Sequence, residues 1–119
     1  MARVIHIREY EPGNPEQVYI GRPQPWRGLT GPFGNPVAIG RTCPECGRVH
    51  ASAGSTLPCY EAYLVNRLVR DPVFQAQVAG LRGKILACFC KPGPCHGDVL
   101  ARWAEQVAQG ASVQLLAEK

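Results

Sequence analysis

The sequence predicts an α/β fold, with a small mixed or mostly parallel sheet and helices packed against it, in a single domain over residues 1–119. Its length of 119 residues suits one domain, and its 45% hydrophobic and 18% charged content is that of a globular chain. Strand-like runs are interspersed with segments of helical periodicity. After Lys84, the run to residue 90 is continuously apolar, the pattern of a central strand covered on both faces.

Two strands are expected in the N-terminal part of the chain. The β-branched run at residues 3–7 predicts the first, and residues 17–20 predict a second that ends at Gly21. Proline and glycine are too dense between residues 22 and 40 for a helix. This stretch is therefore expected to be a long loop of the kind that carries function, with a short strand at residues 37–39.

Helices are expected to follow. Apolar residues at helical spacing predict a helix over residues 59–69, with Pro58 at or just before its first turn. Asp71 is a suitable cap for a second short helix at residues 73–80. The two helices lead directly into the predicted central strand.

The C-terminal part of the chain is expected to complete the domain. Gly83 ends the second helix, and the strand at residues 84–90 follows. A last amphipathic helix is predicted from Asp98 to near Gly110. Residues 112–116 can add an edge strand.

The chain is mildly basic, with a formal net charge of +4. The excess gathers between residues 21 and 50, where Glu45 is the single acid beside four arginines: Arg22, Arg27, Arg41 and Arg48. A basic bias suits a phosphate-bearing small molecule or nucleic acid without demanding either. The cluster is therefore either a phosphate-facing surface or a set of ordinary solvated arginines.

Cysteine usage and the N-terminus bear on the compartment. No apolar run reaches the roughly 18 residues that span a bilayer, and the first residues lead into a strand-like run instead of a signal peptide. A cytoplasmic protein without membrane contact is expected. Because the cytosol keeps thiols reduced, the six cysteines are expected to be metal ligands or reactive thiols.

Four residues in the middle third predict a structural zinc site within an insert at residues 41–59: Cys43, Cys46, His50 and Cys59. Gly47 follows the Cys-x-x-Cys pair and lets the backbone turn so that both sulfurs face one metal. The four residues would make a closed Cys₃His tetrahedron, in which zinc stabilises the fold and has no open position for water. The alternatives are a redox Cys-x-x-Cys pair, an incidental turn, or a Cys59 buried in the core.

A second cluster lies at the carboxyl end of the predicted central strand and supplies the catalytic candidates: Cys88, Cys90, Cys95, His96 and Asp98. Cys88 and Cys90 share a face of the strand, at the end of the sheet where α/β proteins bind ligands. The last helix presents free N–H groups to an anion there. Three interpretations stay open: a small-molecule pocket with a nucleophilic cysteine and His96 as acid or base, a second zinc or iron–sulfur site, or core thiols with a capping histidine. Asp98 is equally suited to cap the helix or to take part in catalysis.

Three motifs together resemble the bacterial and phage family called domain of unknown function 4326. They are Val-Tyr-Ile-Gly-Arg-Pro at residues 18–23, Gly-Asn-Pro at residues 34–36, and a long motif at residues 83–100 that holds Cys-Phe-Cys and Cys-His-Gly-Asp. The resemblance covers nearly the whole chain but implies no particular reaction. Members of the family typically have Trp-Gly-Asn-Pro-Phe where this chain has its Gly-Asn-Pro motif. Here residues 27–33 separate Trp26 from Gly34.

The cysteine–histidine turn is also similar to that of another uncharacterised family, domain of unknown function 488. In that family Cys-His-Arg follows a similar strand, and Gly97 stands here in place of the arginine. Both resemblances imply, by analogy, nucleotide or nucleic-acid chemistry.

Two functional hypotheses follow. The first is an enzyme or ligand-binding domain for a nucleotide-like or other phosphate-bearing small molecule, in which the strand-end cluster is joined by four ligand-binding residues: Gly21, Arg22, Gly34 and Asn35. The second is a zinc-stabilised module without catalysis that binds nucleic acid or protein through the arginine-rich residues 21–50.

Overall fold

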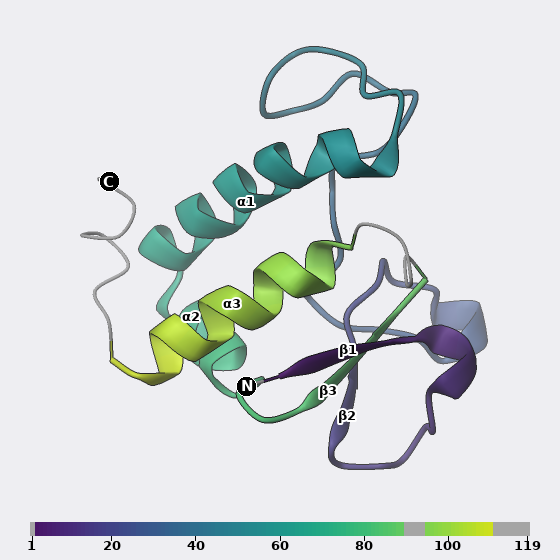
Figure 1. Cartoon of the computed structure of the whole chain (residues 1–119), viewed down its shortest axis with the longest axis vertical. Helices are drawn as coiled ribbons and strands as arrows, with labels where there is room; N and C mark the ends of the chain where they lie inside the picture. Colours follow the sequence, from purple (N-terminus) through teal and green to yellow (C-terminus); the bar gives the residue numbers. More distant parts are fainter. Residues whose placement is uncertain (1, 90–94, 111–119) are drawn as a thin grey trace.

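The computed structural model of the chain describes residues 2–89 and 95–110 (Figure 1). Three strands form one wholly parallel sheet of order β1-β3-β2: β1 (Arg3–His6), β2 (Gln17–Tyr19) and β3 (Ile85–Cys88). Three α-helices pack with this sheet: α1 (Ala53–Arg70), α2 (Pro72–Ala79) and α3 (His96–Ala108). The predicted α/β class and the parallel sheet are therefore confirmed.

The last strand in the sequence is the central one in the sheet, as its apolar run predicts. Leu86, Ala87 and Cys88 are all fully buried, although successive residues of a strand point to opposite faces. Helix α3 contacts β3 and β1, and α1 and α2 pack on α3. The connection from β1 to β2 carries a 3-10 helix (Ile7–Glu9) that contacts β3, and Tyr10 of the same connection lies beside Tyr19.

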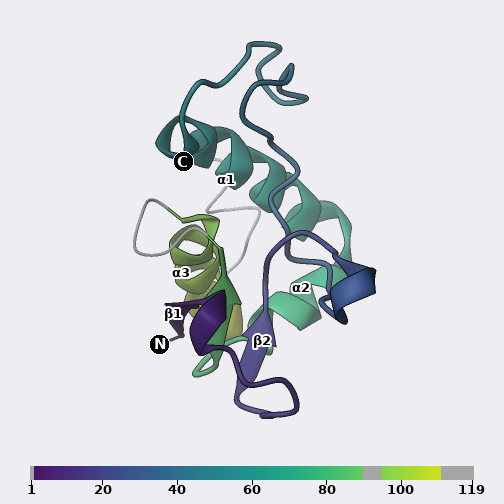
Figure 2. The same cartoon turned by 90° about the vertical axis from the view of Figure 1, so that its right-hand side faces the viewer.

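The helices form one continuous core with the sheet. Figure 2 shows that α3 lies between α1 and the strands. The largest fully buried side chains include Tyr60 and Leu64 of α1, Phe74 of α2 and Leu100 of α3. Asp71 caps α2 as predicted, because its Oδ1 accepts a hydrogen bond from the backbone N–H of Phe74 at 3.0 Å. Within the described part of the chain, no helix is both long and apolar enough to cross a membrane.

The prediction for the start of the first long helix is wrong by six residues. Helix α1 begins at Ala53, and Pro58 lies inside it instead of in its first turn. A proline there costs one intrahelical hydrogen bond, which is why the sequence pattern favoured a later start. Tertiary burial of Thr56 and Tyr60 outweighs that cost, and Ser55 binds the carbonyl of Ser52 through both its N–H and its Oγ.

Two further element predictions need correction, and one lies outside the described residues. Residues 37–39 form no strand: the N–H of Val37 donates to Asn35 Oδ1 and its carbonyl accepts from Arg22, so side chains take the place of a neighbouring strand. Helix α3 begins at His96, two residues before Asp98, because the Cys95 sulfur caps it. The edge strand predicted at residues 112–116 falls outside the described part of the chain.

Candidate metal centre and strand-end pocket

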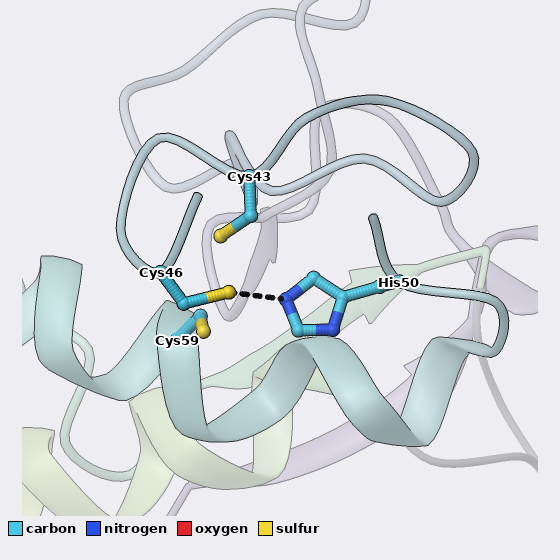
Figure 3. Close-up of side chains that lie close together, drawn as sticks. All are labelled: Cys43, Cys46, His50 and Cys59. Carbon is cyan, nitrogen blue, oxygen red and sulfur yellow. Dashed lines mark hydrogen bonds between the residues drawn. The ribbon is translucent and has the colours of Figure 1, made fainter. Parts of the chain in front are cut away.

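The structure brings the four predicted zinc ligands together into one cluster (Figure 3). The Sγ atoms of Cys43, Cys46 and Cys59 and one ring nitrogen of His50 all lie within 4.8 Å of one another. The Cys46 Sγ and the His50 Nε2 are 3.6 Å apart. Three sulfurs and an imidazole at this spacing can hold a metal ion.

A tight hairpin in the insert positions the first two sulfurs. The N–H of Cys43 bonds the carbonyl of Arg48 at 2.7 Å, and the N–H of Gly47 bonds the carbonyl of Cys43 at 2.9 Å. Gly47 has a φ of 74°, a left-handed conformation that favours glycine. Cys59 projects from the second turn of α1, so the expectation that it lies at a helix N-terminus is wrong, although it reaches the cluster.

A hydrogen-bond chain orients the His50 ring. Ser55 Oγ donates to the carbonyl of Ser52 at 2.8 Å, and the His50 Nδ1 lies 3.2 Å from the same Oγ. A hydroxyl has one hydrogen to give, so Ser55 must accept from His50, and the proton belongs on Nδ1. The lone pair of Nε2 is then directed at the sulfurs, the arrangement that second-sphere partners impose on metal-binding histidines.

The thiols of the cluster differ in their affinity for protons. Burial raises the pKa of Cys43, but hydrogen bonds from the backbone N–H groups of Cys46 and Glu45, together with contacts to the side chains of His50 and Cys46, lower it to about 6. Burial and the neighbouring thiols raise the pKa of Cys59 to about 12. Three thiolates repel one another at this spacing, so only a bound cation would keep all three deprotonated at neutral pH.

The strand-end residues do not form one open cluster. Cys88 at the end of β3 and Cys95 before α3 are fully buried, with their Sγ atoms 2.7 Å apart. Cys90 lies outside the described residues. Asp98 is exposed in the first turn of α3, whereas His96 is buried and faces a pocket. Their catalytic roles stay predictions.

A pocket of about 1050 Å³ opens at the carboxyl ends of β2 and β3. Its walls come from the loop at residues 21–42, from Thr56 and Leu57 of α1, from Phe89 and from His96. The four predicted ligand-binding residues all line it: Gly21, Arg22, Gly34 and Asn35. The motifs that the sequence analysis singled out therefore meet at one pocket.

Hydrogen bonds and a close backbone approach shape one wall of this pocket. Arg22 Nε donates to the carbonyl of Asn35 at 2.9 Å, and Asn35 Nδ2 lies 3.4 Å from Thr56 Oγ1. A Cβ on Gly34 would come within 2.9 Å of the Arg22 Cα, so only glycine fits there. Arg22 and Asn35 thus fix the loop against the sheet and against α1.

His96 occupies the floor of the pocket. Its Nε2 lies 2.7 Å from the carbonyl oxygen of Ile20, and its ring contacts the edge of Tyr60 at 5.1 Å between centroids. Burial lowers the pKa of His96, and the carbonyls of Ile20 and Phe33 offset this in part. The imidazole is therefore mainly neutral at pH 7, with Nε2 as donor to the carbonyl.

Sequence reasoning gave no pocket role to three residues that line it: Thr56, Leu57 and Arg41. Thr56 and Leu57 were assigned to the insert because the start of α1 was placed too late. Phe89, in the Cys-Phe-Cys motif expected at the pocket, does line it, but it follows the end of β3 instead of lying within the strand and is 41% exposed. Arg41 was counted only among the clustered arginines, yet it lines the pocket.

These features define a small α/β protein with a parallel three-stranded sheet, a Cys₃His cluster that can hold a metal, and a pocket at the strand ends. Residues 5–106 match the family model described as Domain of unknown function (DUF4326), so the chain belongs to that family. The resemblance noted from its motifs is confirmed.

One curated relative matches part of the chain. An "Uncharacterized 12.4 kDa protein in nrdA-td intergenic region" of Enterobacteria phage T4 is 33% identical over 55 residues. The match covers 46% of this chain and 51% of the phage protein, so it spans about half the length of that relative. No solved structure matches the chain.

Proposed function

We propose that this chain is a zinc-stabilised domain that binds a nucleotide-like, phosphate-bearing small molecule in the pocket at the strand ends. The observation that carries the proposal is the charge of the pocket wall. The described lining residues include two arginines, Arg22 and Arg41, and no aspartate or glutamate. A concave site with one sign of charge concentrates ligands of the opposite sign.

Two helix termini add to this positive character. Thr56 and Leu57 lie in the second turn of α1, and His96 is the first residue of α3, so both helices begin near the pocket. The N-terminal end of a helix carries a partial positive charge and unpaired N–H groups that favour phosphate. The ligand is therefore expected to be an anion.

Phe89 supports a nucleobase as the other part of the ligand. Its ring lines the pocket, is partly exposed, and is held edge-on by Tyr19 and by His6, each 6.4 Å away between centroids. The guanidinium of Arg27 lies 5.9 Å from the same ring. A fixed aromatic face beside cationic groups suits a base joined to a phosphate.

Zinc is the metal that best suits the Cys₃His cluster. Structural zinc takes four tetrahedral ligands of sulfur and nitrogen, and two sulfurs bound at about 2.3 Å lie about 3.8 Å apart. The ligand atoms here need only a small contraction from their spacing of up to 4.8 Å. We infer a structural role, because all four positions are taken by protein, and a reducing cytoplasmic compartment that keeps the thiols available.

A binding titration tests the proposal. Calorimetry with a nucleoside monophosphate, the matching nucleoside and inorganic phosphate should show tightest binding of the nucleotide. Arg41→Ala is expected to raise its Kd about tenfold or more, since a hydrogen bond to a charged group is lost. Arg70→Ala, an exposed arginine at the far end of α1, is the matched control and should leave Kd unchanged. Equal effects of the two variants, or no binding of any nucleotide at millimolar concentration, would contradict the proposal.

The alternative function, a nucleic-acid binding module, has one specific observation in its favour. Trp26 is 78% exposed and is followed by Arg27, which reaches over Phe89. An aromatic surface with arginines suits single-stranded nucleic acid. Titration of a short oligonucleotide at several salt concentrations distinguishes the two, because only strand binding should weaken steeply with salt.

A further inference from the structure

Cys88 and Cys95 form a pair of thiols with no assigned role. Neither side chain has any exposed surface, and their sulfurs lie 2.7 Å apart. Cys88 ends β3 and Cys95 caps α3, so the contact joins the central strand to the helix that packs on it. Both residues belong to the main hydrophobic core.

The separation of the two sulfurs is shorter than that of two thiolates bound to one metal ion. Two thiolates on one zinc lie about 3.8 Å apart, since each Zn–S bond is about 2.3 Å long. The contact between Cys88 and Cys95 is more than 1 Å shorter than that. It is closer to the Sγ–Sγ length of about 2.05 Å in a covalent bond between sulfurs.

The surroundings favour Cys95 as the sulfur that reacts first. The backbone N–H of Gly97 donates to its Sγ at 3.3 Å, at the N-terminal end of α3. Such a donor stabilises negative charge on sulfur. Full burial excludes bulky oxidants such as protein disulfides, so the oxidant must be about the size of water.

We propose that Cys88 and Cys95 are a peroxide-sensitive dithiol that closes to a reversible disulfide within the folded protein. The Cys95 thiolate attacks one oxygen of hydrogen peroxide, the O–O bond breaks, and the departing hydroxide leaves as water with the thiol proton. Cys95 is then a sulfenic acid. The Cys88 sulfur attacks the Cys95 sulfur, the S–O bond breaks, and a second water leaves with the proton of Cys88. The two sulfurs give up two electrons, and one peroxide becomes two waters.

The folded chain already places the two reacting atoms. Closing the bond requires the sulfurs to approach by less than 1 Å, and both belong to ordered elements. Cys88 directly precedes Phe89 and Cys95 directly precedes His96, two residues of the pocket wall. The oxidation state of the pair therefore bears on the pocket, a consequence that rests on the proposed function. The crosslink itself does not depend on any ligand.

Peptide mapping tests the proposal on the full chain with its metal bound. The protein is treated with one to a few equivalents of hydrogen peroxide, alkylated in denaturant and digested with trypsin. Residues 85–102 are released as one peptide that holds Cys88, Cys90 and Cys95 and no member of the metal cluster. The expected product carries an internal disulfide between Cys88 and Cys95, with Cys90 alkylated, and dithiothreitol reverses it. The oxidised protein should melt about 5 °C higher or more.

Variants separate the pair from its neighbour. Cys90→Ser should form the same crosslink at the same rate, and Cys88→Ser should leave a sulfenic acid on Cys95 that dimedone traps. If Cys88→Ser fails to fold, the maps of wild type and Cys90→Ser decide the question. A bond between Cys90 and either partner, or peroxide consumed without any crosslink in this peptide, would overturn the proposal.

Discussion

The two cysteine groups of this protein use the same side chain in opposite surroundings. Cys43, Cys46 and Cys59 gather with His50 where a hairpin meets α1, and Cys46 is exposed to solvent. Cys88 and Cys95 lie in the core with no exposed surface, and their two sulfurs contact each other. The first group has the spacing of ligands around a cation, and the second has the spacing of atoms that can bond to each other.

The difference shows what spacing in the sequence can and cannot decide. The metal cluster draws three ligands from residues 43–50, and a local hairpin brings them together. The buried pair depends on how β3 and α3 pack, which is a tertiary result. Whether a cysteine of this chain is suited to bind a metal or to form a redox pair is therefore decided by packing, and not by the number of cysteines.

Removal of the metal is expected to have the largest effect. A structural zinc contributes on the order of 10 kcal/mol to small metal domains. Chelation should therefore unfold the hairpin at residues 41–52 and leave the sheet intact, because the main hydrophobic core includes no residue of this hairpin. Hydrogen exchange by mass spectrometry measures this: exchange should rise at residues 41–52 and stay slow at β3. Equal loss of protection in both regions would contradict a local role.

Gly97→Ala tests the packing of α3 on the sheet, next to the buried cysteine pair. A Cβ at this position would lie 2.7 Å from Ile20 Cδ1 and 3.0 Å from Val4 Cγ1, so the packing of α3 on the sheet must give way. The free energy of unfolding should fall by about 1–3 kcal/mol, measured by urea denaturation. Gly80→Ala is the matched control, because Gly80 has a φ of −67° and ordinary contacts. The control should be near neutral.

Ser55→Ala tests whether the His50 ring is oriented for a metal. Loss of the acceptor at Nδ1 should weaken metal affinity about 10–100-fold, as loss of second-sphere partners does elsewhere. Competition with a chromophoric chelator gives the affinity. Ser52→Ala is the control, since the Ser52 side chain makes no capping hydrogen bond. An unchanged metal affinity in Ser55→Ala would contradict this, because it would mean that Ser55 does not orient the His50 ring for the metal.

The smallest expected effect is a pH dependence from His96. Its pKa in the folded protein is lowered by burial from the usual value of 6.5, so the unfolded chain binds the proton first as pH falls. Stability is therefore full above about pH 6.5 and declines below it, with a slope of at most about 1.4 kcal/mol per pH unit for one group. His96→Gln should flatten the slope between pH 7 and 5. An unchanged slope would assign the dependence to other groups.

Much of the fold followed from local patterns. The apolar run of β3, the Asp71 cap and the amphipathic α3 are signals contained in a few neighbouring residues. The start of α1 was missed because Pro58 is a local argument against helix that burial of Tyr60 overrides. The strand expected at residues 37–39 does not form, because Arg22, 15 residues earlier in the sequence, donates to the carbonyl of Val37 in place of a neighbouring strand.

The candidate site was predictable to a similar degree. The ligands of the metal cluster could be named from a Cys-x-x-Cys motif and a nearby histidine, since metal geometry constrains spacing. The pocket motifs could be named from the sequence, but their contacts could not. The Arg22 side chain donates to the carbonyl of Asn35, and the Asn35 side chain contacts Thr56, so both side chains are engaged within the protein. The place of Thr56 in the pocket could not be predicted, because a single threonine in a helix does not by itself indicate a binding site.

The metal content of purified protein tests the central claim, that the two cysteine groups have separate chemistry. Inductively coupled plasma mass spectrometry should find one zinc per chain in wild type and in Cys88→Ser, and none in Cys46→Ser. Loss of the metal from Cys88→Ser with retention in Cys46→Ser would contradict the account, because the buried pair would then hold the metal.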